Sequence, residues 1–370
     1  MRILVLNYEF PPLGGGAAPA SFEIAKRLAE SKDIAIDVIT MGFGTLPAFE
    51  ELAPNFRVHR VKCLRSRRDV SQTWELAIYL IAGFFKANEL IKKERFHKTH
   101  CHFLIPTGIL ALILKLRYGL PYILSAHGSD VPGYNPDRFV FLHFFTRPLL
   151  KFICNQAERI IALSHYLKDL IRQKIAHYDD GKLVVIPNGI DAHRYAPLEK
   201  ERIILSTGRL LPRKGFQNLI QSVSAKDFGY EVHIAGEGPM MRELQSMAKN
   251  SKTRVIFHGW MDNRSEGYRE LLGKAGIYCL VSRNENASIA LLEAMSAGCA
   301  VITSEAPGCV ETVGQSGKPL PYDDIVALTN TLTALTSDLN MQHEYGVRAR
   351  NRILANYQWQ DVIKEYRKLF

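Results

Sequence analysis

Two carboxylates and the loop before the second of them carry the clearest chemical signal in the chain. Glu285 lies in a polar loop, 284–287, and Glu293 lies in the helix predicted to follow it. A loop between a buried strand and a helix N-terminus is where α/β proteins bind anions. Glu293 falls on the helix face that Ile289 helps to bury, and a buried carboxylate needs a partner. Pairing of Glu293 with a structural cation, with Glu285 merely solvated, is the alternative to ligand binding.

The pattern around these carboxylates predicts one βαβ unit. The apolar runs 277–282 and 299–303 predict buried strands, and 288–297 predicts a helix between them. Ser288 is suited to cap the start of this helix, and Gly298 is suited to end it. The unit would hold the polar loop at the carboxyl edge of a parallel sheet.

A second loop, GRLLPRKG, carries Arg209 and Lys214 directly after the predicted strand 203–206. An exposed basic loop is one reading, and an anion site is the other. A nucleoside diphosphate carries about three negative charges and gains more when it departs as a leaving group. Arg and Lys side chains aimed at it would therefore stabilise the transition state more than the ground state.

Two loops in the N-terminal half also lie at predicted strand ends. The strand 122–126 runs into HGSD, which places His127 at a ligand-binding edge, with a hydrogen-bonded structural histidine as the alternative. The strand 2–6 runs into Gly14, Gly15 and Gly16, before a helix predicted at 21–30. The glycines form either a flexible turn or a close backbone approach to a ligand. They do not fit the G-x-G-x-x-G fingerprint, so a nicotinamide dehydrogenase is disfavoured.

The motifs together resemble a known family. Glu285, seven residues, Glu293 and then AMSAGCAVIT is similar to the signature of retaining, nucleotide-sugar-dependent glycosyltransferases of the GT-B "family 4" group. GGG, HGSD, PNGID, GRLLPRKG and GEGP stand in the order that such a chain would have. One departure is that 286–288 read Asn-Ala-Ser, where many members carry Gly-aromatic-Gly. The identity of the sugar is therefore not indicated.

The resemblance implies a role for each candidate residue. Glu285 and His127 would be catalytic and face the reacting sugar, while Glu293 would hold the nucleotide ribose. The diphosphate would lie on Arg209, Lys214 and main-chain groups of the helix start. The resemblance implies no metal ion and no cofactor. The remaining candidates contribute to the donor site or border the acceptor: Asn286, Ala287, Ser288, Ile289, Gly236, Gly238, His258 and Gly259 for the donor, 14–16 for donor or acceptor, and Asp130 for the acceptor.

Length and pattern predict two domains. The chain has 370 residues, and PNGIDAHRYAPLEK interrupts its apolar pattern with turn-forming residues. We expect an α/β protein of the GT-B class, with two Rossmann-like, doubly wound domains that face each other across a cleft. The predicted divisions are an acceptor-side domain at 1–190, a donor domain at 191–352, and a C-terminal helix at 353–370 that returns to the first domain.

Hydropathy and cysteine content indicate the cellular compartment. No apolar run is long enough for a transmembrane helix, and 1–12 read as a first strand and not as a secretion signal. The six cysteines form no C-x-x-C pair and are expected to be reduced. The sequence therefore predicts a cytoplasmic enzyme.

Charge suggests an anionic partner. The net charge is +10, and residues 1–170 hold 22 Lys and Arg against 15 Asp and Glu. With Arg65, Arg67, Arg68 and the Phe-rich segment after Val140, this balance predicts peripheral binding to the inner face of an anionic membrane, with a lipid-linked hydroxyl acceptor. A nucleotide-sugar epimerase or sugar phosphorylase is the first alternative. A nucleic-acid-binding protein is a distant one, because no recognition motif of known type is present.

Overall fold

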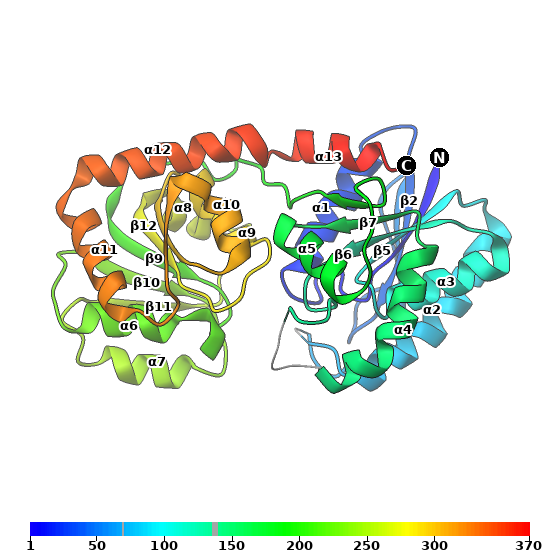
Figure 1. The fold of residues 1–370 in the computed structure, drawn as a ribbon, viewed down its shortest axis with the longest axis horizontal. Helices are drawn as coiled ribbons and strands as arrows, with labels where there is room; N and C mark the ends of the chain where they lie inside the picture. The colour runs from blue at the N-terminus through cyan, green and yellow to red at the C-terminus, as the bar shows by residue number, and fades with distance from the viewer. Residues whose placement is uncertain (69, 135–139) are drawn as a thin grey trace. The chain divides into compact units, whose positions relative to one another are not determined.

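The computed structural model describes residues 1–68, 70–134 and 140–370, with the side chains of 140–145 left undescribed. It divides into two compact units (Figure 1). The N-terminal unit is Met1–Pro187 with Val362–Phe370, and the C-terminal unit is Asn188–Asp361. The predicted boundary after residue 190 lies close to this division.

The N-terminal unit is built on one twisted sheet. In the described residues, eight strands follow the order β3-β4-β2-β1-β5-β6-β7-β8, and every neighbouring pair is parallel except β3 with β4. The strands are β1 Arg2–Leu6, β2 Ala35–Met41, β3 Phe49–Ala53, β4 Phe56–Val61, β5 Lys98–His102, β6 Tyr122–Ala126, β7 Arg159–Ala162 and β8 Leu183–Val185. The helices are α1 Ala17–Ala29, α2 Thr73–Lys93, α3 Thr107–Tyr118, α4 Val140–Gln156 and α5 His165–Lys174.

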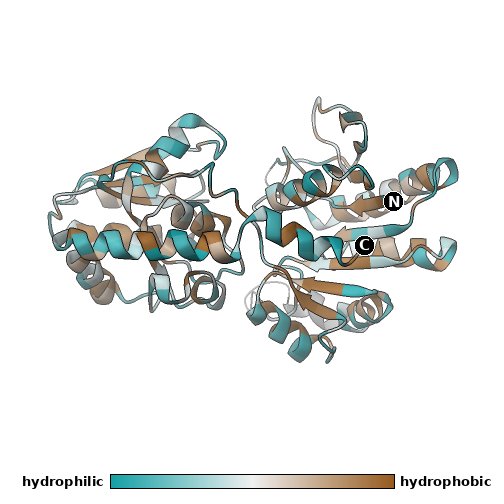
Figure 2. Cartoon of the chain, turned by 90° about the horizontal axis from the view of Figure 1, so that it is seen from above, coloured by the Kyte–Doolittle hydropathy of each residue, from teal (hydrophilic) through white to brown (hydrophobic). Residues whose placement is uncertain are grey.

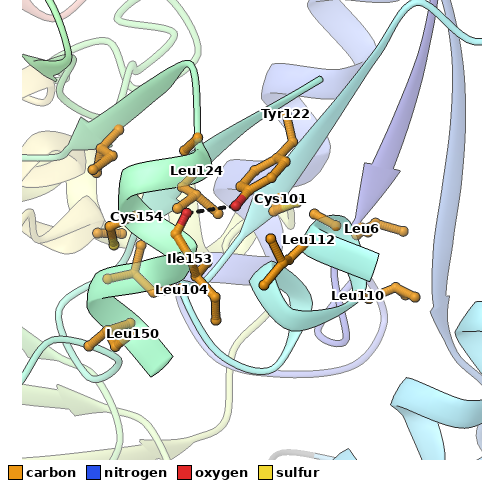
Figure 3. Packing of buried hydrophobic residues seen from close by; sticks show 14 of the residues in the cluster. Leu6, Cys101, Leu104, Leu110, Leu112, Tyr122, Leu124, Leu150, Ile153 and Cys154 are labelled. Atoms are coloured by element: carbon orange, nitrogen blue, oxygen red, sulfur yellow. Dashed lines mark hydrogen bonds between the residues drawn. The ribbon is translucent and has the colours of Figure 1, made fainter. Parts of the chain in front are cut away.

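Strands β1, β2, β6 and β7 of this unit are buried and apolar along most of their length. Brown strands are visible in this unit in Figure 2. Leu110 and Leu112 of α3 and Ile153 of α4 pack in one cluster with Leu124 of β6 (Figure 3). The Tyr122 hydroxyl, at 0% exposure, donates to the Ile153 carbonyl oxygen over 2.6 Å. The buried apolar side chains of α3 and the described buried apolar side chains of α4 thus belong to the core.

The C-terminal unit repeats the doubly wound pattern with a fully parallel sheet. Its described strands follow the order β11-β10-β9-β12-β13-β14. They are β9 Glu201–Thr207, β10 Glu231–Ala235, β11 Val255–Gly259, β12 Ala275–Leu280, β13 Ala300–Ser304 and β14 Gly317–Leu320. The helices are η1 Pro212–Lys214, α6 Phe216–Ser224, α7 Met241–Ala248, α8 Glu266–Lys274, α9 Ile289–Ser296, α10 Pro307–Val313, η2 Gly314–Ser316, α11 Ile325–Ser337 and α12 Leu339–Asn356, before α13 Trp359–Arg367. The prediction of two Rossmann-like sheets is confirmed.

The last residues of the chain are divided between the two units. α12 ends at Asn356, and α13 follows it from Trp359. Ile353 and Tyr357 belong to the core of the C-terminal unit, so residues 353–361 group with that unit and not, as predicted, with the first. Tyr366 of α13 is fully buried with its ring 5.9 Å from that of His100, and the Leu369 carbonyl accepts from Lys98 Nζ over 2.7 Å.

Two further expectations need correction. α1 begins at Ala17 and not at residue 21, because Pro19 falls in its first turn, where a missing backbone N–H costs nothing. Arg65 is buried, and its guanidinium donates to the carbonyls of Tyr8, Arg67 and Arg68. It holds the loop and is not available as a surface charge.

Candidate active site

Loops after four strands of the second sheet come together at its carboxyl edge. Gly208 N donates to Ala235 O over 3.0 Å, Gly236 N to Gly259 O over 2.7 Å, and Leu210 N to Glu237 O over 2.9 Å. Gly236 has φ +152°, and a Cβ on it would lie 1.8 Å from the Gly208 carbonyl oxygen. Only glycine fits there, so Gly236 and Gly259 serve first to join the loops after β9, β10 and β11.

Lys214 and Glu285 form an ion pair at this edge, with both side chains mostly buried. Lys214 ends η1, and Glu285 stands in the loop between β12 and α9. Gly215 allows the approach, because it has φ +74° and a Cβ on it would lie 2.0 Å from Val281 O. Arg283 N also donates to Arg213 O over 2.7 Å. Lys214, which was assigned to the diphosphate, and Glu285, which was assigned to the sugar, are thus held against each other.

The start of α9 lies in the same loop. Ser288 occupies the N-cap position with φ −72° and ψ 111°, but its side chain makes no capping hydrogen bond, which corrects the expected cap. Asn188 Nδ2 donates to Ala287 O over 3.0 Å and fixes the loop before the helix. The first amides of a helix have no acceptor within it, so this end can bind an anion. Gly298, with φ +69°, follows the end of α9 as predicted.

Glu293 is buried inside α9, with 3% of its surface exposed. Its Oε1 accepts from Tyr195 Oη over 3.1 Å and from Asn263 Nδ2 over 2.9 Å, and its Oε2 accepts from Tyr268 Oη over 2.7 Å. Burial raises the pKa of this carboxyl group, while the three hydrogen bonds lower it. These three hydrogen-bond partners are neutral groups. Among the described residues, the Glu293 carboxylate is therefore not paired with a structural cation, which was the alternative to ligand binding.

The other donor-side candidates lie on the same edge. Arg209 is exposed and stands between β9 and η1, and Gly238 lies in the loop after β10. His258 is an exposed residue of β11, and its Nε2 lies 3.0 Å from Nδ1 of His233. Burial lowers the pKa of His258, and the charge interaction with His233 lowers it further. The Gly259 carbonyl accepts from Gly236 N, and the predicted place of Gly259 in the donor site stays a prediction.

In the N-terminal unit His127 follows β6 directly. Its Nε2 shares a hydrogen bond with Nδ1 of His102, 3.1 Å away, and the Phe103 ring lies 4.6 Å from its own. Burial lowers the pKa of His127 to about 4, so the imidazole is neutral near pH 7. His102 and Phe103 were not predicted, although the alternating His100 and His102 at the end of β5 were a usable signal.

Asp130 is buried beside this histidine. Its Oδ2 accepts from Leu104 N over 2.7 Å, and its Oδ1 accepts from His127 N over 2.9 Å. Burial raises the pKa of Asp130 to about 6, against the hydrogen bonds, which lower it. The carboxylate ties the loop of His127 to the loop after β5, and its predicted contact with an acceptor stays a prediction.

The triple-glycine loop immediately precedes α1. Gly14 N donates to Arg68 O over 3.0 Å, and Gly15 N donates to Glu9 Oε2 over 3.2 Å. A Cβ on Gly15 or Gly16 would meet no heavy atom within 4 Å, so their backbone is open to an approaching group. Within 1–68, 70–134 and 140–370, no three His, Cys, Asp or Glu side chains gather as metal ligands would.

Known protein families and individual proteins match this chain along most of its length. The description "Glycosyltransferase Family 4" matches residues 14–194, and "Glycosyl transferases group 1" matches 190–352. The chain is 23% identical to N-acetyl-alpha-D-glucosaminyl L-malate synthase of Bacillus anthracis, over 97% of this chain and 94% of that protein. It is 26% identical to GDP-mannose:cellobiosyl-diphosphopolyprenol alpha-mannosyltransferase of Xanthomonas campestris, over 99% and 95%.

Among solved structures, HepE of Anabaena in complex with UDP-glucose matches with a TM-score of 0.76 at 16% identity, covering 100% of this chain and 99% of that one. At this identity the likeness shows the fold. The two matched regions together span residues 14–352, which contain every described strand of both sheets except β1. The chain belongs to family 4 of the glycosyltransferases and has the GT-B fold.

Proposed function

We propose that this glycosyltransferase takes its sugar from a nucleoside-diphosphate donor and transfers it with retention of the anomeric configuration to a hydroxyl acceptor. The Lys214–Glu285 pair beside the start of α9 carries the proposal. The Lys214 cation and the amides at the start of α9 would bind the diphosphate, and the adjacent Glu285 carboxylate would contact the sugar. Glu293, deeper in the same helix, is assigned to the ribose.

The chemistry uses these charges in sequence. The bond between the anomeric carbon and the diphosphate oxygen breaks as the acceptor oxygen bonds to that carbon from the same face. The acceptor proton passes to the departing phosphate oxygen. Arg209 and Lys214 stabilise the charge that grows on the diphosphate, and Glu285 stabilises the positive charge that grows on the sugar. His127 is proposed to bind the reacting sugar as a neutral imidazole.

The donor is expected to be a UDP-sugar first and a GDP-sugar second. The UDP-glucose complex of HepE and the GDP-mannose donor in the name of the Xanthomonas enzyme support testing both. That enzyme's name also gives a diphosphopolyprenol acceptor, which supports a lipid-linked acceptor in cell-envelope glycan synthesis here. The predicted cytoplasmic location stays part of the proposal.

A donor screen tests the proposal. UDP-, GDP- and ADP-sugars are added in a thermal-shift assay, where a donor at about 100 times its dissociation constant stabilises by about 2.7 kcal/mol. The donor found is then incubated with hydroxyl acceptors, and the anomeric configuration of the product is read by NMR. Release of an epimer or of free sugar, with no transfer, would overturn the proposal.

Transfer is expected to need no divalent metal. Arg209, Lys214 and the α9 amides already supply positive charge for the diphosphate, and the sequence contains no Asp-x-Asp triplet. The rate of transfer in 5 mM EDTA should equal the rate without EDTA, within about twofold, because chelation removes no group that stabilises the transition state. Loss of transfer in EDTA, restored by magnesium or manganese, would show that the diphosphate assignment is wrong.

The pH profile should show an acid limb from Asp130. Its folded pKa of about 6 lies above the usual value of 3.8, so the native state takes up this proton as pH falls from 6 toward 4. Protonation weakens the hydrogen bonds that Asp130 accepts from His127 N and Leu104 N, which position the loop of His127. The kcat/KM should therefore fall about tenfold per pH unit below 6. Asp130→Asn should lose the limb and have a lower, flat rate. A limb at pH 6 that survives in Asp130→Asn would contradict the assignment, since His127 titrates near 4.

A further inference from the structure

Three helices of the N-terminal unit lie side by side and cover one face of its sheet (Figure 1). α2 packs on β2 and β4, α3 packs on β5 and β6, and α3 contacts both α2 and α4. Arg117 lies over the Phe84 ring at 6.0 Å, and Lys115 Nζ donates to Gln156 O over 2.7 Å. The three helices therefore present one continuous outer surface, called here the α2–α4 face.

The α2–α4 face carries large apolar side chains that point away from the core. On α2, Ile81 is 63% exposed and Phe85 is 65% exposed. With Trp74 and Ala77, also exposed, they repeat at the spacing of one stripe along a helix. The stripe continues over the neighbouring helices with exposed apolar residues at Ile113, Leu116, Leu149 and Phe152. Single exposed apolar residues are ordinary, but a stripe over three helices indicates a binding surface.

Basic residues surround these apolar ones. The exposed cations of the α2–α4 face are Lys92, Lys93, Arg117, Arg147 and Lys151. α2 has two acids: Glu75 is fully buried, and Glu89 is 2.7 Å from both Lys86 and Lys93. α3 and α4 contain no acid at all. The Lys92 and Lys93 side chains also line a hollow of about 510 Å³ at the ends of α2 and α3.

We propose that the α2–α4 face binds the surface of an anionic lipid bilayer. Apolar side chains flanked by exposed Lys and Arg match the interface of such a bilayer, where apolar groups insert and cations meet lipid phosphates. A second copy of the chain is a poor occupant, because it would bring the same excess of positive charge against itself. The proposal goes beyond the transfer reaction, since none of these residues belongs to the donor site.

The surface differs from the one that the sequence predicted. Of the three arginines named there, Arg65 is buried. The side chains of Phe139, Phe141, Phe144 and Phe145 lie outside the described residues. Leu149 and Phe152, from the end of the Phe-rich segment, are exposed and belong to the α2–α4 face.

Vesicle co-sedimentation of the full chain tests the proposal. Vesicles of phosphatidylcholine with 30% phosphatidylglycerol are compared with pure phosphatidylcholine at low salt. The wild type should bind the anionic vesicles at least about tenfold more tightly. Ile81→Ser with Phe85→Ser should weaken this binding about tenfold or more, because two apolar side chains no longer insert. Lys92→Glu with Lys151→Glu should do the same on anionic vesicles.

Matched variants in the other unit serve as controls. Val326 and Leu339 are 69% and 57% exposed, and their change to Ser should leave binding unchanged. Arg242→Glu with Lys249→Glu alters the net charge equally at exposed positions and should have little effect. Circular dichroism and an unchanged donor-induced thermal shift show that each variant is folded and that the donor site is intact.

Equal recovery with both vesicle types, or wild-type recovery of the Ile81/Phe85 variant, would overturn the proposal. A wild-type dimer that this variant dissociates, without vesicle binding, would instead assign the face to a protein interface. Neither result would affect the proposed transfer reaction, because donor binding and the configuration of the product are measured without vesicles.

Discussion

Glu285→Gln should lower turnover by about 10²- to 10³-fold while leaving the affinity for the nucleoside diphosphate nearly unchanged. The carboxylate contributes most when the anomeric carbon becomes cationic, and glutamine keeps the shape but removes the charge. The lost pairing also frees the charge of Lys214 for the diphosphate. Steady-state rates with the full donor, together with calorimetry with the diphosphate, measure the two effects separately.

Two further variants define this result. Lys214→Met should weaken diphosphate binding by about 1.5–3 kcal/mol, the range for one hydrogen bond to a charged group. Because Lys214 and Glu285 are in contact, the double variant should deviate from additivity. Glu305→Gln changes an exposed carboxylate of the same unit and should have wild-type rates. A loss of diphosphate affinity in Glu285→Gln as large as that in Lys214→Met would mean that Glu285 binds the nucleotide and not the sugar.

Glu293 should affect both nucleotide binding and stability. Glu293→Gln should weaken diphosphate binding by about 1.5–3 kcal/mol if the carboxylate also accepts from a ribose hydroxyl. Glu293→Ala should lower the free energy of unfolding by about 3 kcal/mol or more, because Tyr195, Asn263 and Tyr268 lose their common acceptor. Calorimetry and urea unfolding measure these changes.

Tyr268→Phe separates the two roles of Glu293. It removes one hydrogen bond to Oε2 and keeps the ring and the carboxylate. Stability should fall by about 1 kcal/mol, and the diphosphate affinity should stay. If Tyr268→Phe and Glu293→Gln lose the same diphosphate affinity, Glu293 acts only by supporting the fold of α9.

Local pattern was enough to predict the elements that hold the site. The apolar runs around 277–303 are bounded by a polar loop and by Gly298, and the structure has β12, α9 and β13 there within about two residues. β3 was not predicted, because its sequence, FEELA, does not alternate between apolar and polar residues. The strand pairs antiparallel at the sheet edge and buries none of its side chains fully, with Phe49 half exposed. Edge strands need little burial and so leave a weak pattern.

Partners of the site residues could not be predicted in the same way. Glu293 was expected to be buried and to need a partner, yet Tyr195, Asn263 and Tyr268 come from distant segments that only the folded unit brings together. The Lys214–Glu285 pair likewise depends on the close approach of Gly215 to Val281, the residue after β12. Charge was also misleading at Arg65, since a count of cations does not reveal which of them the fold buries.

Calorimetric titration with UDP and with GDP, in EDTA, tests the central assignment most directly. The wild type should bind one of the two diphosphates, and Lys214→Met should bind the same one about 10- to 150-fold more weakly, which corresponds to 1.5–3 kcal/mol. Wild-type protein that binds neither diphosphate, or a Lys214→Met variant with unchanged affinity, would contradict a nucleotide-sugar site at the start of α9.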